Sequence, residues 1–178
     1  SDDLQMIKFA ESKLTQIVPN NFKKYNNIFA FDSTVSYTGS IKDHATELVA
    51  SFVKAQEHID GLALASTGNM GASEAAGMTF IEKQAHIFLP ESTPKWKIAK
   101  IEKYGGKVHV VKGNYDQAVL NAREFVEDNK KLIYGGETVL RLCGNTLLAK
   151  IMVDQLEDYP DFLFIPVGDG AQYYGFLL

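Results

Sequence analysis

Short apolar runs alternate with one-faced helical patterns along most of this chain of 178 residues. Runs at 61–65, 85–89 and 107–111 have the length and composition of buried strands. After Asp43, apolar residues return with the spacing of an amphipathic helix. Short strands joined by helical crossovers form parallel sheets. The chain is therefore expected to adopt an α/β fold, in which a mainly parallel sheet carries helices on both faces.

Two further strands and five helices are expected on the same grounds. Strands are also expected at 27–32 and 162–167, where apolar runs are bounded by polar or glycine-containing turns. The helical patterns predict helices at 43–53, 69–78, 94–104, 115–128 and 144–156. Gly105 is expected to end the third of these helices, and Asn114 is expected to cap the fourth.

Composition excludes several classes of function. The net charge of −4 gives no general attraction to nucleic acid or to anionic membranes, and no apolar stretch is long enough to span a bilayer. The single cysteine, Cys143, excludes an internal disulfide framework and indicates a reducing compartment, with the cytoplasm as the default. Its thiol is expected to be buried. No histidine has a partner at zinc-site spacing, and His86 and His109 are expected to be structural.

Three segments rich in turn residues enter expected helices. They are the loop that ends at Lys42, the Ser-Thr-Gly-Asn turn at 66–69, and the Gly-Asp-Gly-Ala-Gln turn at 168–172. In open parallel sheets, ligands bind beyond the carboxyl ends of the strands, where such loops gather. We therefore expect the three segments to meet at one site.

The chemistry of these segments suits a phosphorylated aldehyde. Lys42 supplies an amine that attacks a carbonyl, and Asn69 supplies a hydrogen-bonding amide. Glycines let the amides of 168–172 point at a phosphate. Each segment alone also has a plain interpretation, because most lysines are solvated and most Asn- or Gly-rich turns only reverse the chain. The combination, in this order, favours a binding site.

The three segments resemble motifs of the fold-type II pyridoxal phosphate (PLP) enzymes, the tryptophan synthase β superfamily. Residues 37–44 read Tyr-Thr-Gly-Ser-Ile-Lys-Asp-His, which is similar to the family's Pro-Thr-Gly-Ser-Phe-Lys-Asp-Arg. Residues 66–69 match its Ser-x-Gly-Asn loop, and residues 168–172 occupy the place of its glycine-rich phosphate loop. Within the superfamily the chain most resembles threonine synthase, through 112–118 and Pro-Val-Gly-Asp-Gly at 166–170.

The resemblance implies PLP as the cofactor and assigns roles to individual residues. Lys42 would bond the cofactor covalently and move protons at the substrate Cα. Asn69 would contact the cofactor's 3′-oxygen, and Ser66, Thr67 and Gly68, together with Asn69, would hold the carboxylate of an amino acid substrate. The phosphate would be bound by Gly168, Asp169, Gly170, Ala171 and Gln172. Departures from the family pattern are His44, Asp169 and Ala171, and an anionic Asp169 beside a phosphate costs free energy unless it points away.

The resemblance also implies a division into lobes. Residues 1–54 and 131–178 would form parts of a large PLP-binding lobe, and 55–130 would form a small mobile lobe that carries the Asn69 turn. Members of the family are much longer, so the large lobe is expected to be incomplete after 168–172. An incomplete sheet leaves an unpaired edge, which predicts a homo-oligomer or association with a missing C-terminal half.

The implied activity is that of a PLP-dependent carbon–oxygen lyase of threonine synthase type, in amino-acid biosynthesis. It converts O-phosphohomoserine to threonine and phosphate. Arg141 is a candidate contact for the substrate phosphate, or else a solvated arginine at the start of a helix. Two alternatives stay open. One is β-replacement or β-elimination, as in cysteine synthases and serine or threonine dehydratases. The other is a non-catalytic relative or fragment that keeps the scaffold.

Overall fold

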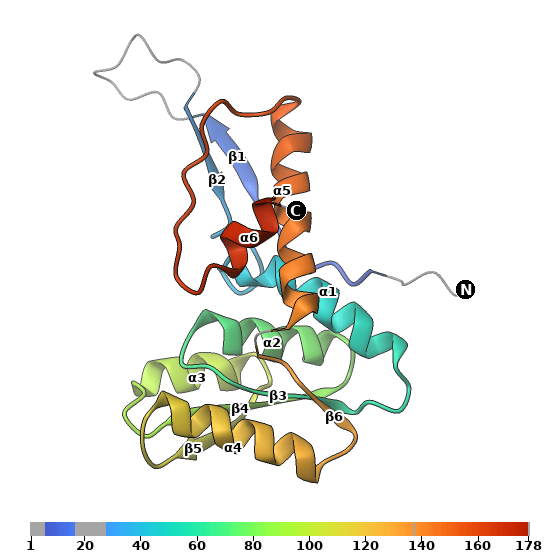
Figure 1. Cartoon of the computed structure of the whole chain (residues 1–178), viewed down its shortest axis with the longest axis vertical. Helices are drawn as coiled ribbons and strands as arrows, with labels where there is room; N and C mark the ends of the chain where they lie inside the picture. The colour runs from blue at the N-terminus through green and yellow to red at the C-terminus, as the bar shows by residue number, and fades with distance from the viewer. Residues whose placement is uncertain (1–5, 17–27, 137, 178) are drawn as a thin grey trace.

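The computed structural model describes residues 6–16, 28–136 and 138–177. A parallel sheet with helices on both faces forms one part of the molecule (Figure 1). The helices α5 (Val139–Leu156) and α6 (Ala171–Leu177) form the other part, together with a strand pair. The two parts meet where α5 packs against α1 (Lys42–Ala55), in the middle of the long axis of the molecule (Figure 1).

The parallel sheet has four strands in the order β5-β4-β3-β6. Its strands are β3 (Gly61–Ala65), β4 (Gln84–Pro90), β5 (Lys107–Val111) and β6 (Leu132–Tyr134). Three of them coincide closely with the apolar runs that predicted strands. All the pairings are parallel, as expected from the helical crossovers.

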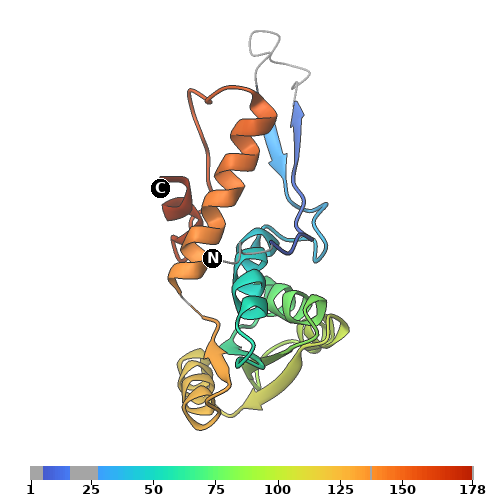
Figure 2. The same cartoon turned by 90° about the vertical axis from the view of Figure 1, so that its right-hand side faces the viewer.

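Alternate residues of each strand face opposite layers of helices. Leu62, Leu64 and Ile87 pack with α1 (Lys42–Ala55), α2 (Asn69–Phe80) and α3 (Lys95–Lys103) on one face. Ala63, Ala65 and Phe88 pack with α4 (Tyr115–Asp128) on the other. Figure 2 shows α4 separated from α1 and α2 by the sheet. Each large apolar side chain that is fully buried in this way contributes about 1.5–3 kcal/mol to folding.

Two helix ends confirm the turn chemistry expected from the sequence. The Asn114 side chain accepts a hydrogen bond from the Gln117 amide at 3.0 Å and so caps α4. Gly105 has a φ of +87°, a left-handed conformation that ends α3 and that glycine adopts without strain.

The second part of the molecule contains an antiparallel pair, of which the sequence patterns predicted only one strand. It joins β1 (Lys13–Gln16) to β2 (Phe29–Asp32). The expected strand at 27–32 corresponds to β2, although residue 27 lies outside the described residues. The Gln155 side chain bonds the Leu14 amide and the Ser12 carbonyl, each at 2.8 Å, and so ties β1 to α5 (Val139–Leu156).

Glycines let the helices of this part pack closely. A Cβ on Gly144 of α5 would lie 2.7 Å from the backbone of Ala45 in α1. A Cβ on Gly175 of α6 (Ala171–Leu177) would lie 2.4 Å from Asn145 of α5. Neither position has room for a side chain, so these contacts fix the start of α1 relative to α5 and α6.

The expected strand at 162–167 is not formed. These residues carry no regular secondary structure, and several of their side chains are exposed, including Phe164 at 93%. A strand is held by hydrogen bonds to its neighbours, and no described strand pairs with this segment. The prediction rested on composition alone, which does not supply a partner. Within the described residues, no helix is long and apolar enough to cross a membrane.

Candidate functional site

Asp43 holds the loop that precedes Lys42 against the start of α1. Its carboxylate is fully buried and accepts hydrogen bonds from the Ser36 hydroxyl at 2.9 Å and from the amide and hydroxyl of Thr38 at 2.7 and 2.6 Å. The loop is therefore held to the first turn of α1 by three bonds to one residue. The Lys42 amide adds a 3.2 Å bond to the Ser40 hydroxyl. This arrangement fixes the backbone from which the Lys42 side chain extends.

Lys42 lies opposite the glycine-rich turn before α6. A cavity of about 130 Å³ is lined by Lys42 together with Pro166, Gly168, Asp169, Gly170, Gln172 and Tyr173. The sequence separates Lys42 from this turn by more than a hundred positions. The packing of α5 between α1 and α6 brings together these two of the three segments that were expected to meet.

The glycine-rich turn leaves open space where a bound group would lie. A Cβ on Gly168 or Gly170 would meet no atom within 4 Å, in contrast to the closely packed Gly144 and Gly175. Gly170 has a φ of +82°, which glycine adopts without strain. The Asp169 carboxylate turns back and accepts a hydrogen bond from the Ala171 amide at 3.1 Å. An amide that a phosphate would use is thus already bonded to an anionic side chain.

The turn at 66–69 follows β3 and leads into α2. The Ser66 hydroxyl accepts hydrogen bonds from the amides of Gly71 at 2.8 Å and Gly68 at 3.4 Å, and so satisfies one amide of the first turn of α2. The Ser66 amide itself donates to the Phe88 carbonyl at 3.0 Å, so it is committed to the sheet rather than to a ligand. Asn69 begins α2, with its side chain exposed.

Helices α1 and α2 run side by side in the same direction. Ser73 donates to the Thr46 hydroxyl at 2.8 Å, and one turn later a Cβ on Gly77 would lie 3.5 Å from Ala50. Because Thr46 and Ser73 each lie one turn after the first residue of their helix, Lys42 and Asn69 start adjacent helices at the same end. Among the described residues, however, the lining of the Lys42 cavity comes from Lys42 and residues 166–173, without a contribution from 66–69.

Sequence reasoning missed Glu74, which lies fully buried on α2. Its Oε1 is 4.0 Å from Nε of Arg141, which is itself 3% exposed on the first turn of α5. Burial raises the pKa of Glu74 to about 7, and the Arg141 guanidinium acts in the opposite direction. The interpretation of Arg141 as a solvated residue is therefore wrong. A signal did exist, because Glu74 is a lone charge among the small residues of this helix.

Two other expectations can be compared with the structure. Cys143 is exposed on α5, so the expectation of a buried thiol is wrong. It lies on the face of the helix away from Arg141 and Asn145, both of which are buried.

His86 and His109 belong to a stacked aromatic cluster under α4, with Nδ1 of His86 3.0 Å from Nε2 of His109. This packing agrees with a structural role for the pair.

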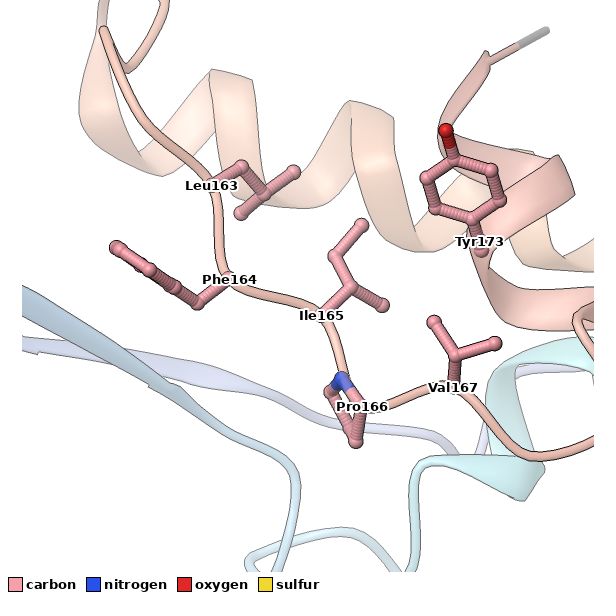
Figure 3. Close-up of a pocket in the computed structure, with 6 residues that line it drawn as sticks. All are labelled: Leu163, Phe164, Ile165, Pro166, Val167 and Tyr173. Carbon is pink, nitrogen blue, oxygen red and sulfur yellow. The ribbon is translucent and has the colours of Figure 1, made fainter.

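A continuous apolar surface lies next to the site. Residues 163–167 and Tyr173 line a second hollow of about 520 Å³. Figure 3 shows Leu163, Ile165 and Val167 on the side of the nearby helices, whereas Phe164 points away from them. Alternating directions are typical of an extended strand, although no neighbour pairs with this segment among the described residues.

The residues around Lys42 fit the cofactor that the resemblance implies. An amine at the start of α1 faces a turn whose glycines border open space. These features offer a covalent anchor and backbone donors for a phosphate. Asp169 is the one residue of the turn that opposes an anion.

Comparison with known proteins is consistent with these observations. The family model described as "Pyridoxal-phosphate dependent enzyme" matches residues 15–178. Threonine synthase of Bacillus sp. (strain ULM1) is 32% identical over 135 residues, which are 75% of this chain and 38% of that protein. Threonine synthase of Methanocaldococcus jannaschii is 30% identical over 178 residues, which are 96% of this chain and 43% of that protein.

A solved structure is similar over most of the chain. The processed form of threonine deaminase isoform 2 from Solanum lycopersicum superimposes with a TM-score of 0.76 and 26% identity, over 84% of this chain and 41% of that one. The chain therefore spans about two fifths of the length of each of these proteins.

Proposed function

The chain belongs to the family of pyridoxal-phosphate dependent enzymes, and on this premise we propose that it is the Lys42-bearing part of a lyase of threonine synthase type. The proposed reaction converts O-phosphohomoserine and water to threonine and phosphate. The observation that carries the proposal is the single cavity in which Lys42 faces the turn at 168–172. Because the chain spans only part of its relatives' length, the activity is proposed for the whole functional protein.

The proposed roles follow from the position of each residue. Lys42 would hold the cofactor through its side-chain amine, which condenses with an aldehyde by loss of water, and it would hold or move a proton at the substrate Cα. When bound, the cofactor supplies an electron sink for a carbanion. The turn at 168–172 holds the phosphate through backbone amides, and Asn69 donates its amide N–H to the 3′-oxygen. Ser66 to Gly68 hold the substrate carboxylate, chiefly through Thr67 and Gly68, because the Ser66 amide is committed to Phe88.

Arg141 supports a substrate that carries a phosphate. It is a buried cation on the first turn of α5, and α5 packs directly on α1. A planar guanidinium suits bidentate recognition of phosphate oxygens. Glu74 sits 4.0 Å away and offsets part of this charge while it is ionised. Neutralisation of Glu74 by a proton therefore strengthens the attraction of Arg141 for an anion.

A second candidate is β-elimination from serine or threonine, as in a dehydratase. It is supported by the likeness to a threonine deaminase at 26% identity and by the carboxylate of Glu74 facing Arg141. An ionised Glu74 pairs with the Arg141 guanidinium and leaves it less positive charge for a substrate phosphate. A substrate without a phosphate does not need that charge. The two candidates are separated by comparing turnover of O-phosphohomoserine with that of free threonine and serine. The non-catalytic alternative predicts no turnover of either.

Residues 55–130 are proposed to close on the substrate as a unit. They contain the sheet strands β3 to β5 and the helices α2 to α4, which pack on the two faces of that sheet. Closure would bring the turn at 66–69 toward the Lys42 cavity and expel water from it.

The single cysteine is consistent with a reducing compartment, and we propose that the protein is cytoplasmic.

We further propose that residues 162–167 are covered in the functional protein. Phe162 and Val167 are 83% and 64% exposed, and such a run is an edge suited to strand pairing. The proposed cover is a second copy of the chain or a polypeptide that completes the large lobe. Light scattering on the native protein together with its intact mass tests this, and a monodisperse monomer of this chain alone would contradict it.

The test of the function uses the natural protein with any copurifying chain. It is incubated with PLP, reduced with borohydride and digested. We expect the protein to be yellow before reduction, and the label to be found afterwards on the peptide that contains Lys42. Lys42→Ala should remove the label, whereas Lys54→Ala, an exposed lysine in the last turn of the same helix, should keep it. A colourless and unlabelled wild type would refute the proposal.

A further inference from the structure

Lys100 of α3 reaches across to the first residue of α2. Its Nζ lies 3.0 Å from Oδ1 of Asn69. Resting on the function proposed above, we propose that Lys100 is a positioning residue, which fixes the amide of Asn69 with its N–H groups toward the cofactor.

The identity of the donor decides which way the Asn69 amide faces. A lysine ammonium has donors and no acceptor, so only the carbonyl oxygen of the amide can face it. The NH₂ group of Asn69 is then turned away from Lys100 and stays available. A donor is what the anionic 3′-oxygen of the cofactor requires, because that oxygen accepts hydrogen bonds. Without Lys100, the amide of this exposed residue is free to present either end.

The contact is built into the packing of α3 on α2. Ile101, the residue after Lys100, is 1% exposed and packs against the first turn of α2. A Cβ on Gly71 would lie 3.2 Å from the Ile101 side chain, so glycine is what permits this approach. Both partners of the bond belong to the part of the molecule around the sheet, where α2 and α3 lie on the same face (Figure 1). The pair therefore moves together if 55–130 closes.

Lys100 also brings an uncompensated positive charge to the site. The ion pairs found among the described residues join Lys131 to Asp60, Arg141 to Glu74 and Lys150 to Asp154, and none includes Lys100. Its charge adds to the partial positive charge at the start of α2. An anionic oxygen bonded to Asn69 is stabilised by both. Two other lysines of α3 contact neighbouring rings instead, since Lys97 lies over Trp96 and Lys103 over Tyr104.

The competing view is that the bond is an ordinary surface contact. Such an exposed contact contributes little to stability and nothing to a ligand. The two views differ in what happens to cofactor affinity when Asn69 is absent. A positioning residue loses its effect together with the residue that it positions, whereas a general charge effect persists.

The experiment is a double-mutant cycle on the natural protein, read out as the dissociation constant for PLP from equilibrium dialysis and as the absorption maximum of the bound cofactor. We expect Lys100→Met to weaken PLP binding by about 3- to 10-fold. Lys100→Arg, which keeps the donors, should retain most of the affinity. Lys95→Met, an exposed control at the start of the same helix, should match the wild type. In the Asn69→Ala background, Lys100→Met should have no further effect.

The outcomes separate this inference from the function on which it rests. If the wild type binds no PLP, the proposed function is wrong, and the role of Lys100 that rests on it is wrong too. If the wild type binds PLP but Lys100→Met binds equally well, Lys100 has no role at the site. If Lys100→Met weakens binding equally with and without Asn69, the effect is one of charge and the positioning role is wrong. The thermal midpoint of each cofactor-free variant shows whether the fold is kept.

Discussion

The hydroxyl of Ser73 donates to the hydroxyl of Thr46 across the interface of α1 and α2, with 2.8 Å between the oxygens and both side chains buried. This bond joins two helices whose first residues are Lys42 and Asn69. The residue proposed to bond the cofactor and the residue proposed to orient it are thus held in register by a contact one turn away from each.

Thr46→Val should therefore destabilise the fold. The substitution keeps the shape of the side chain but leaves the Ser73 hydroxyl without its acceptor in a buried position, which costs about 1–3 kcal/mol. Urea unfolding measures the loss. Ser73→Ala combined with Thr46→Val should cost less than the sum of the two single changes, because the bond is lost only once. Additive losses would show that the two hydroxyls do not interact.

Asp169→Asn should strengthen PLP binding. The Asp169 carboxylate accepts a bond from the Ala171 amide at 3.1 Å, beside the place proposed for the cofactor phosphate. An asparagine keeps an acceptor for that amide and removes the like charge. We expect an affinity gain of about 3- to 10-fold, decreasing with added salt, as measured by equilibrium dialysis. Asp161→Asn removes the same charge from an exposed position outside the turn and should change little.

Glu74 should make the protein less stable as the pH rises. Burial raises its pKa in the folded state from 4.5 to about 7, so between these values the folded protein binds the proton more tightly than the unfolded chain does. The free energy of unfolding should then fall across this range, by on the order of 3 kcal/mol at most. Urea unfolding at several pH values should show this slope in the wild type and a weaker slope in Glu74→Gln. An unchanged slope in that variant would contradict the prediction, and Glu127→Gln serves as an exposed control.

His86 should make the protein less stable as the pH falls, the opposite of the effect of Glu74. Burial, followed by repulsion from His109 and Lys107, lowers its pKa from 6.5 to about 4. In this range the unfolded chain binds the proton more readily, so stability should decline as the pH falls from 6.5 toward 4. His86→Gln should reduce this decline in the free energy of unfolding, and His58→Gln, on an exposed residue, should leave it unchanged. A decline that persists in full in His86→Gln would assign it to other groups.

The sequence predicted the elements whose partners are near in the chain. The strands at 61–65, 85–89 and 107–111 and the helix after Asn114 formed as expected, because short apolar runs and a local cap specify them directly. The segment 162–167 shows the limit of this reasoning. Its composition is that of a strand, but a strand exists only with a neighbour, and a composition cannot provide one.

For the site, the sequence identified Lys42 and the turn at 168–172, and the structure placed them in one cavity. It did not reveal Glu74 opposite Arg141 or Lys100 beside Asn69. These pairs join residues that are 67 and 31 positions apart along the chain, on helices whose relative placement no local pattern encodes.

The amino-acid sequence by itself determined the alternation of strands and helices, the turns that hold glycine and the family to which the chain belongs. Only the tertiary structure decided which side chains meet. Periodicity and capping act over a few residues, whereas the meeting of α1, α2, α3 and α5 depends on how closely Gly71, Gly77 and Gly144 let their neighbours approach. The environment of Lys42, the burial of Arg141 and the orientation of Asn69 all follow from that packing.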